Sequence, residues 1–318
     1  MKSEQWGTPT RSRCLSPLRA WLLIPVLLLG SCAQPATSGQ NPEVPTSTQF
    51  EPTAEAPAPV NTLTPTAAPS AATPTSQQDQ GCSAEGGTIE SLVVQNSELF
   101  RAMPVRVYLP PCYAEGQSHS YPTLYLLHGL QSTDDQWDEL GIDEAADRLI
   151  SSGSLPPFII VMPWHRTGID LTTAVPKVLV PYIDSNFDTR ANRRHRAVGG
   201  LSRGGGQALE IGLNYPELFG AVGMHSPAVP HTDATILDWT LRVPIDLRPR
   251  LWIDIGYRDS LHPAARSLVE ELQGNAVPIT IQFDEGDHLA SYWESHLEGY
   301  LRWYAQQWVR ASFEDTDY

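Results

Sequence analysis

The sequence predicts an α/β fold in which helices cover both faces of a mainly parallel central sheet. Short apolar runs bounded by turn residues recur through residues 82–318, and helical patterns lie between them. Strands that alternate with helices favour parallel pairing, because each helix returns the chain to the same end of the sheet. The chain has 318 residues, of which 41% are hydrophobic. This is enough for one enzyme-sized core.

The expected strands are apolar or alternating runs that end at turn residues. They cover Val105–Leu109, Thr123–Leu127, Phe158–Met162, Ala197–Gly199, Ala221–Met224, Leu251–Ile255 and Ile279–Phe283. The expected helices repeat apolar residues at helical spacing. They cover Asp143–Ile150, Ala174–Ser185, Gly205–Leu213, Pro263–Leu272 and Tyr292–Trp308. Parallel sheets bind ligands at the carboxyl ends of their strands, so the residues after each run are the candidates for chemistry.

Charge and motif content exclude several classes of function. The chain has 21 Lys and Arg against 36 Asp and Glu, a net charge of −15, which would repel a nucleic acid partner. A membrane-spanning transporter is excluded because there is no run of 18 apolar residues. The four cysteines form no C-x-x-C pair, and neither a nucleotide-binding loop nor an H-E-x-x-H motif is present. We therefore expect no metal and no cofactor.

Residues 1–31 are typical of an export signal. Basic residues precede the nine-residue apolar run Trp21–Leu29, which is too short to span a bilayer. The alternative for this run is a buried core helix. The next residues, Leu29-Gly30-Ser31-Cys32, resemble the lipobox of bacterial lipoproteins. That resemblance implies cleavage before Cys32, acylation of its thiol, and an extracytoplasmic protein that meets the membrane only through its lipid anchor.

Residues 32–81 are expected to be the acylated cysteine and a disordered linker. From Ala33 to Gly81 the chain holds nine Pro, nine Thr and nine Ala, no Lys or Arg, and Phe50 as its single aromatic. Such a composition buries too little apolar surface to offset the entropy of the chain. The segment fits a stalk that holds a folded domain, residues 82–318, away from a membrane. A passive tail would have the same composition.

Two cysteines are expected to form a disulfide. If the signal is removed with Cys14 and Cys32 is acylated, Cys82 and Cys112 are the remaining thiols of the exported chain. Thiols in an oxidising compartment pair readily. The bond would connect the start of the domain to the strand Val105–Leu109.

The pentapeptide Gly200-Leu201-Ser202-Arg203-Gly204 is the first candidate for catalysis. It follows an expected strand and opens an expected helix, so Ser202 would lie on a sharp strand-to-helix turn. Small residues at Gly200 and Gly204 are needed because a side chain there would collide with the turn. The helix start would offer free amides to a developing oxyanion. Taken alone, the pentapeptide also fits an ordinary glycine-rich loop.

A nucleophilic serine needs an imidazole to take its proton and a carboxylate to orient that imidazole. Asp259 lies four residues beyond the end of Leu251–Ile255, and His288 lies five residues beyond the end of Ile279–Phe283. Both therefore fall in loops at strand ends, in the order serine, acid, histidine.

Other residues compete for these roles. Asp254 is an alternative acid, but it lies inside an apolar strand and is expected to be structural. His296 is an alternative base, but it lies inside the last helical pattern. His225 directly follows Ala221–Met224 and could approach the site.

An oxyanion hole needs a second amide, and the loop after Thr123–Leu127 can supply it. That strand ends in His128-Gly129-Leu130, which could aim the amide of Leu130 beside that of Arg203.

Four motifs resemble the putative esterase family of α/β-hydrolases. They are P-T-L-Y-L-L-H-G-L with Trp137 downstream, A-V-G-G-L-S-R-G-G-G-Q-A-L, G-Y-R-D-S-L and G-D-H-L-A-S-Y-W. The family includes feruloyl and acetylxylan esterases, enterochelin esterases, S-formylglutathione hydrolases and the mycolyltransferases of the antigen 85 group. The resemblance covers about Ser91 to Trp308 and implies the α/β-hydrolase fold.

The resemblance also implies roles for individual residues. Ser202 would be the nucleophile, His288 the base and Asp259 the acid, with the amides of Leu130 and Arg203 forming the oxyanion hole. The chain departs from the family at Arg203, where relatives often carry Met. It departs again at Pro111-Cys112-Tyr113, where relatives often carry Gly before the Tyr.

The function implied is an extracytoplasmic serine carboxylesterase that acts through an acyl-enzyme on small-molecule or carbohydrate-linked esters. An acyltransferase of the mycolyltransferase type would share every catalytic residue, and a catalytically silent binding domain could share the fold. Residues 225–250, the segment most able to form a lid, have room for a helix such as Ala234–Leu241 but not for a large cap domain. The active site is therefore expected to be open. The sequence leaves the oligomeric state undecided.

Overall fold

The computed structural model describes residues 86–113 and 119–314. The chain divides into two units, Met1–Ala72 and Thr73–Tyr318, and everything described here belongs to the second. The expected export signal, the acylated Cys32, the linker and Cys82 lie outside the described residues and stay predictions. Among the helices that are described, none has the length and hydrophobicity needed to cross a bilayer.

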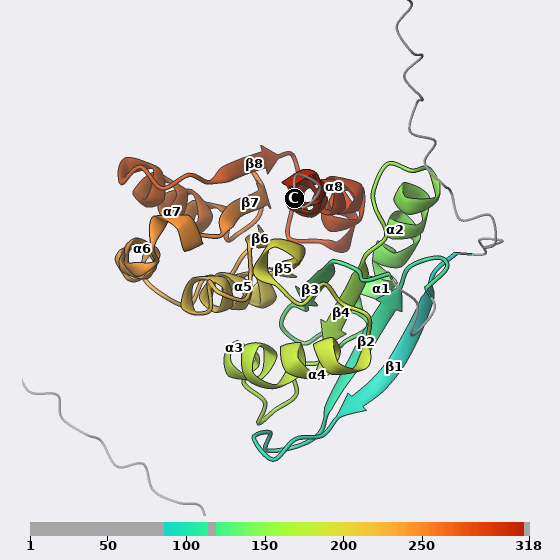
Figure 1. The fold of residues 1–318 in the computed structure, drawn as a ribbon. Coiled ribbons are helices and arrows are strands. Elements are labelled where there is room, and N and C mark those ends of the chain that lie inside the picture. The colour runs from blue at the N-terminus through green and yellow to red at the C-terminus, as the bar shows by residue number, and fades with distance from the viewer. Residues whose placement is uncertain (1–85, 114–118, 315–318) are drawn as a thin grey trace, which may run out of the picture. The chain divides into compact units, whose positions relative to one another are not determined.

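The centre of the domain is an eight-stranded sheet with the strand order β1-β2-β4-β3-β5-β6-β7-β8 (Figure 1). Every pairing from β4 across to β8 is parallel, and β2 pairs antiparallel with both β1 and β4. The prediction of a mainly parallel sheet is confirmed. The strands are β1 (Thr88–Val94), β2 (Met103–Leu109), β3 (Thr123–Leu127), β4 (Ile159–Pro163), β5 (Arg196–Leu201), β6 (Ala221–His225), β7 (Arg250–Gly256) and β8 (Thr280–Asp284).

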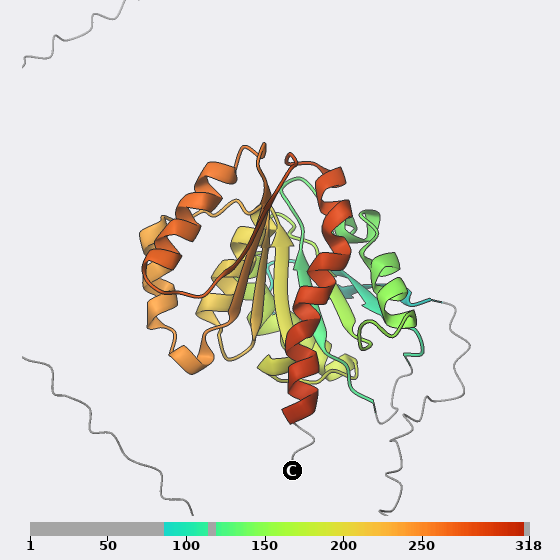
Figure 2. The ribbon, with the colours of Figure 1, turned by 90° about the horizontal axis from the view of Figure 1, so that it is seen from above.

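Helices cover both faces of this sheet, as Figure 2 shows from above. On one face lie α1 (Gln136–Glu139), α2 (Ile142–Ser151) and the long α8 (Ala290–Glu314). On the other lie α3 (Leu171–Ala174), α4 (Val180–Asn186), α5 (Arg203–Asn214), α6 (Asp233–Arg242) and α7 (His262–Gly274). The prediction of two helical layers is confirmed.

The helix expected over Ala174–Ser185 is not one regular α-helix. A five-residue π-helix, Val175–Leu179, separates α3 from α4. Pro176 in the π-helix and Pro181 at the start of α4 lack the backbone N–H that a regular α-helix would use, so the hydrogen-bond pattern changes its register there. The apolar spacing that predicted a single helix gives no sign of the π-helix, because apolar residues recur at nearly the same intervals in both kinds of helix.

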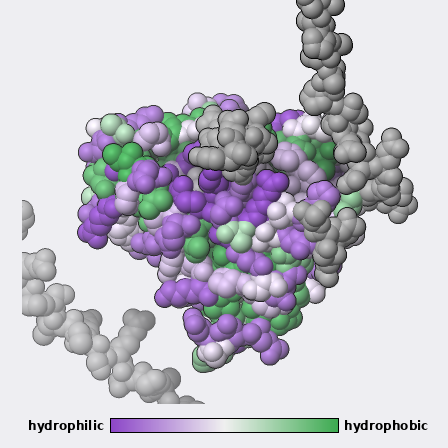
Figure 3. All heavy atoms as spheres, in the orientation of Figure 1, coloured by the Kyte–Doolittle hydropathy of each residue, from purple (hydrophilic) through white to green (hydrophobic). Residues whose placement is uncertain are grey.

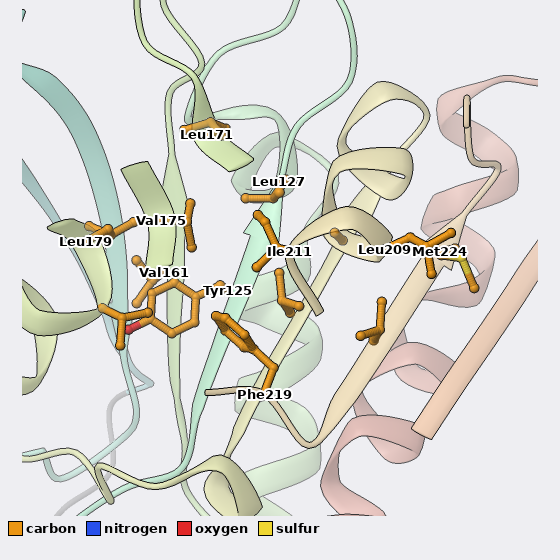
Figure 4. Close-up of a cluster of buried hydrophobic side chains, with 14 of the residues drawn as sticks. Tyr125, Leu127, Val161, Leu171, Val175, Leu179, Leu209, Ile211, Phe219 and Met224 are labelled. Carbon is orange, nitrogen blue, oxygen red and sulfur yellow. The ribbon is translucent and has the colours of Figure 1, made fainter. Parts of the chain in front are cut away.

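The larger core cluster lies between the sheet and the α3–α7 layer. Figure 4 shows Tyr125 and Leu127 of β3 pointing into the same layer as Leu209 of α5 and Leu171 of α3. The rings of Tyr125 and Phe219 meet edge to face, with 5.9 Å between their centroids. These buried contacts fix the position of β3 relative to α3 and α5, and hence the position of the loop at its carboxyl end.

The segment between β6 and β7 contains α6 and a short 3₁₀ helix, Ile245–Leu247, and no further element. Ile236 of α6 is buried in the core, so this helix is part of the covering layer. The expectation of no large cap domain is confirmed. The face drawn in Figure 3 is mostly hydrophilic, with hydrophobic residues in smaller separate groups, as the high content of acidic residues leads one to expect.

Candidate active site

Ser202 occupies the turn between β5 and α5. Its backbone φ of 53° lies in the left-handed region, which is rare for a residue other than glycine and stores strain. Hydrogen bonds hold the turn in place. The Ser202 amide donates to the carbonyl of His225 at 2.9 Å, and the Ser202 carbonyl accepts from the amide of Ala228 at 2.8 Å. The serine is therefore fixed against the end of β6, with its side chain partly exposed.

The glycines on either side of Ser202 are required by close backbone contacts. A Cβ on Gly200 would lie 2.4 Å from the carbonyl carbon of Gly204. A Cβ on Gly204 would lie 2.3 Å from the carbonyl oxygen of Leu127. Both contacts involve backbone atoms, which cannot move aside as a flexible side chain would. The turn thus excludes any side chain at these two positions.

Asp259 and His288 lie in the loops after β7 and β8 and are hydrogen-bonded to each other. The distance from His288 Nδ1 to Asp259 Oδ2 is 2.7 Å. The other carboxylate oxygen of Asp259 accepts the amide of Leu261 at 2.8 Å. The Asp259 side chain is fully buried, whereas 31% of the His288 side chain is exposed. The imidazole can therefore face a substrate while its orienting carboxylate stays out of water.

The surroundings of Asp259 keep it ionised. Burial alone would raise its pKa, but hydrogen bonds from His288, from the Leu261 amide and from Ser226 outweigh burial and hold the pKa below its usual range. Ser226 is buried, and its hydroxyl also accepts the indole N–H of Trp293 at 3.1 Å. No motif in the sequence distinguishes Ser226 from other serines at strand ends, so this residue could not be found from the sequence alone.

The loops that carry Asp259 and His288 are tied to each other. The amide of Arg258 donates to the carbonyl of Gly286 at 2.9 Å. The Arg258 guanidinium forms ion pairs with Glu285 at 2.6 Å and with Asp287 at 3.2 Å. These contacts lie within three residues of Asp259 and His288 along the chain. They hold the acid and the base at a fixed separation.

The sheet brings Ser202 and the Asp259–His288 pair to the same edge. β5, β6, β7 and β8 are parallel neighbours, and each of these residues follows the carboxyl end of one of them. In the described part of the chain no hydrogen bond joins Ser202 Oγ to His288. Catalytic hydrogen bonds are often loose without substrate and tighten in the complex.

The competing acid, Asp254, is paired in the core of the domain. Both Asp254 and His225 have no exposed surface. One Asp254 oxygen bonds to Nδ1 of His225, and the other accepts the hydroxyl of Tyr300 at 2.7 Å. The second ring nitrogen of His225, Nε2, lies 3.0 Å from the hydroxyl of Tyr304. Asp254 and His225 are thus saturated by core partners and cannot reach an ester.

The competing base, His296, lies in α8. Its Nε2 is 3.1 Å from Asp284 Oδ2, and its Nδ1 donates to the carbonyl of Tyr292 at 2.6 Å. Both ring nitrogens are occupied by the helix and by the end of β8, so neither is directed at Ser202.

The loop after β3 approaches Ser202 closely. A Cβ on Gly129 would lie 3.6 Å from Cβ of Ser202. The amide of Gly129 donates to Oε1 of Gln136 at 2.7 Å. Among the described residues, the amides of Leu130 and Arg203 have no backbone acceptor. Two free N–H groups therefore lie on the two segments that meet beside the serine.

His128 supports this loop from inside. It is buried, and its Nε2 accepts the amide of His165 at 2.8 Å. Its Nδ1 therefore carries the proton and donates to the carbonyl of Gly129 at 2.7 Å. Burial lowers the pKa of His128 to about 4, so the ring is neutral at neutral pH.

Comparison with known sequences identifies relatives. Residues 97–304 match the model of a family described as "Putative esterase". An endo-1,4-beta-xylanase/feruloyl esterase of Xylanibacter ruminicola is 33% identical over 156 residues, which are 44% of this chain and 22% of that protein. An esterase of Mycobacterium tuberculosis is 34% identical over 137 residues, which are 38% of this chain and 28% of that protein. The matches span less than a third of each relative.

Solved structures agree on the fold. A ferulic acid esterase superposes with a TM-score of 0.64 and 23% identity, over 70% of this chain and 98% of that one. At this identity the likeness speaks for the fold alone, which is that of the α/β-hydrolases. The family model, however, matches more than half of the residues. The chain therefore belongs to this esterase family.

Proposed function

We propose that the chain is a serine carboxylesterase in which Ser202 is acylated, His288 is the general base and Asp259 orients His288. The observation that carries the proposal is the 2.7 Å hydrogen bond between the partly exposed His288 and the buried Asp259, at the sheet edge where Ser202 lies. Because Nδ1 of His288 is directed at the carboxylate, Nε2 is the nitrogen left to take a proton.

The mechanism follows from this arrangement. Ser202 Oγ attacks the ester carbonyl while His288 Nε2 takes its proton, and the amides of Leu130 and Arg203 donate to the oxyanion that forms. The intermediate collapses, and the protonated His288 gives its proton to the departing alcohol. Water then attacks the acyl-enzyme with His288 again as base, which releases the acid and restores Ser202.

Apolar side chains next to the reacting groups support a substrate with an apolar or aromatic acyl group. Leu130, which follows Gly129, is 65% exposed, and Leu289, which follows His288, is 58% exposed. Large exposed apolar side chains are candidates for ligand contact. With no cap domain over the sheet edge, esters attached to a carbohydrate polymer could enter. We therefore favour acyl or feruloyl groups on carbohydrates as substrates.

A fluorophosphonate probe tests the nucleophile. The wild-type protein should be labelled at Ser202, as located by peptide mass spectrometry, and Ser202→Ala should not be labelled. Gly299→Ala is the control that keeps both the fold and the nucleophile, because a Cβ at this position meets nothing within 4 Å. Labelling of Ser202→Ala at the wild-type rate would refute the assignment. An absence of both labelling and turnover in the wild type would favour a silent binding domain.

A substrate panel separates hydrolysis from acyl transfer. p-Nitrophenyl esters of increasing chain length and feruloylated oligosaccharides would be incubated with and without a sugar acceptor. Release of free acid at the same rate as nitrophenol supports the esterase. An acylated sugar as the main product would instead identify an acyltransferase, which uses the same residues with a different attacking hydroxyl.

We further propose that the protein is an extracytoplasmic lipoprotein anchored through Cys32. The support is the sequence, in which the lipobox-like Leu29-Gly30-Ser31-Cys32 follows an apolar run. Mass spectrometry of the mature N-terminus from the native host should find a diacylglyceryl group on Cys32. A mature chain that starts elsewhere without lipid would contradict this.

A further inference from the structure

We propose that the side chain of Arg203 positions the oxyanion hole by holding the peptide group between Gly129 and Leu130. The inference rests on the proposed serine esterase mechanism and adds a role for a side chain, whereas that mechanism uses only the backbone amide of Arg203.

The carbonyl of Gly129 receives two hydrogen bonds. Nη2 of Arg203 donates to it at 3.1 Å, and Nδ1 of His128 donates to it at 2.7 Å. This carbonyl and the amide N–H of Leu130 belong to one planar peptide group. The described peptide bonds are all trans, so the C=O and the N–H point in opposite directions. Two donors on the carbonyl oxygen therefore fix the direction of the Leu130 N–H.

The charge of Arg203 adds to this effect. Burial lowers the pKa of its guanidinium, but an arginine remains charged in a protein. No carboxylate oxygen in the described part of the chain lies within 4.0 Å of Arg203. Its charge is thus not neutralised locally and acts on the Gly129 carbonyl. A charge-assisted bond to that oxygen polarises the peptide and makes the Leu130 N–H a stronger donor.

Arg203 thereby connects the two halves of the proposed oxyanion hole. Its own backbone N–H forms one half, and its side chain holds the peptide that supplies the other. A methionine here, the residue that the family resemblance leads one to expect, has no hydrogen to donate. It would leave the Gly129 carbonyl to His128 alone. The same turn would then be held by fewer bonds.

The test compares Arg203→Met with Arg203→Lys and with a matched control, Arg166→Met. Arg166 also lies near this edge, but its guanidinium stacks on the ring of Trp164 at 4.9 Å. The measured quantity is the single-turnover acylation rate for a p-nitrophenyl ester and for its thionoester analogue. Sulfur accepts hydrogen bonds poorly, so the ratio of the two rates reports on the oxyanion hole.

We expect Arg203→Met to lower the acylation rate with the oxygen ester about tenfold. This is less than the roughly 10²–10³ fold that follows deletion of a donor itself. KM should stay within about twofold, and the oxygen-to-sulfur rate ratio should fall by a similar factor of about ten. Arg203→Lys should recover part of the acylation rate and part of the rate ratio. Arg166→Met should change neither the rate nor the ratio.

An unchanged rate ratio in Arg203→Met would overturn the proposal, and a raised KM in that case would identify Arg203 as a substrate-binding residue. If Arg203→Met does not fold, Arg203→Gln replaces it, because glutamine can donate a hydrogen bond without a charge. The acylation rate and the oxygen-to-sulfur rate ratio should then decrease in the order wild type, Arg203→Lys, Arg203→Gln. Ser202→Ala is measured in parallel. Activity in Ser202→Ala refutes the proposed mechanism, whereas a dead Ser202→Ala beside a fully active Arg203→Met refutes only the role of Arg203.

Discussion

His288 donates a hydrogen bond to Asp259 across 2.7 Å, although the two residues belong to loops that follow different strands. The pair is asymmetric, because the carboxylate is fully buried and the imidazole is partly exposed. This asymmetry fits a division of labour in which Asp259 orients and His288 exchanges protons with the substrate. Ser202, Asp259 and His288 should then respond to substitution as one unit.

Substitutions of these three residues should have graded effects. Ser202→Ala and His288→Ala should each lower kcat by about 10⁴–10⁶ fold, and Asp259→Asn by somewhat less. The losses should not add in the double variants. Steady-state kinetics on a p-nitrophenyl ester, with circular dichroism to verify folding, measures this. If Asp259→Asn kept full activity, another residue would have to orient His288.

Gly204 should not tolerate replacement by alanine, whereas Gly299 should. Gly204→Ala places a Cβ 2.3 Å from the backbone oxygen of Leu127, so we expect poor folding or a loss of activity of at least about a hundredfold. Gly299→Ala is the control. Its Cβ meets nothing within 4 Å inside α8, and alanine should raise the free energy of unfolding by up to about 1 kcal/mol. Thermal melts and kinetics check both. Normal activity in Gly204→Ala would be inconsistent with the turn described here.

Asp254 should be important for stability and not for chemistry. Asp254→Asn weakens the bonds to His225 and Tyr300 in the core, and we expect a loss of roughly 2–3 kcal/mol in the free energy of unfolding. The control, Asp287→Asn, alters an exposed side chain and should change that free energy by less than about 0.5 kcal/mol. Urea titrations measure both. A folded but inactive Asp254→Asn, beside an active Asp259→Asn, would reverse the two roles.

Protonation of His128 should make stability depend on pH. Its pKa falls from 6.5 in the unfolded chain to about 4 in the folded one. Between these values the unfolded chain binds a proton that the folded chain does not, so the free energy of unfolding falls as the pH falls. The free energy of unfolding should fall by on the order of 3 kcal/mol in total as the pH drops from above 6.5 to below about 4. Urea titrations of wild type and His128→Asn should give a smaller slope for the variant below about pH 6.5 and parallel profiles above about pH 7. Equal slopes throughout would contradict the assignment.

Cys82 and Cys112 should form a disulfide if the protein is exported as proposed. Closing a loop of about 31 residues contributes roughly 3–4 kcal/mol to stability in the chain-entropy model. Cys82 lies outside the described residues, so this pairing stays a prediction. Denatured, unreduced protein should contain no thiol that reacts with a maleimide reagent at either position. Modification of both cysteines before reduction would exclude the bond.

How far the sequence predicts this molecule depends on the kind of signal. Asp259 and His288 could be selected because a strand pattern ends shortly before each of them. The sequence does not predict β1, because Thr88–Val94 is an edge strand with several exposed positions and forms no continuous apolar run. Ser226 and the side chain of Arg203 were not assigned roles, because their partners lie on other strands and loops. Such contacts exist only once the sheet has set its register.

The last long helix gives a final consequence. The hydroxyl of Tyr304 occupies the space above Gly199, where a Cβ would lie 1.8 Å from it, and Trp293 bonds to Ser226. α8 therefore completes the support beneath both the serine turn and the acid. During synthesis from the N-terminus, Ser202, Asp259 and His288 all emerge from the ribosome before this helix can dock. The proposed esterase activity should thus appear in one late step, after nearly the whole domain has emerged from the ribosome. A nascent chain would then be inactive toward esters in the cell that makes it.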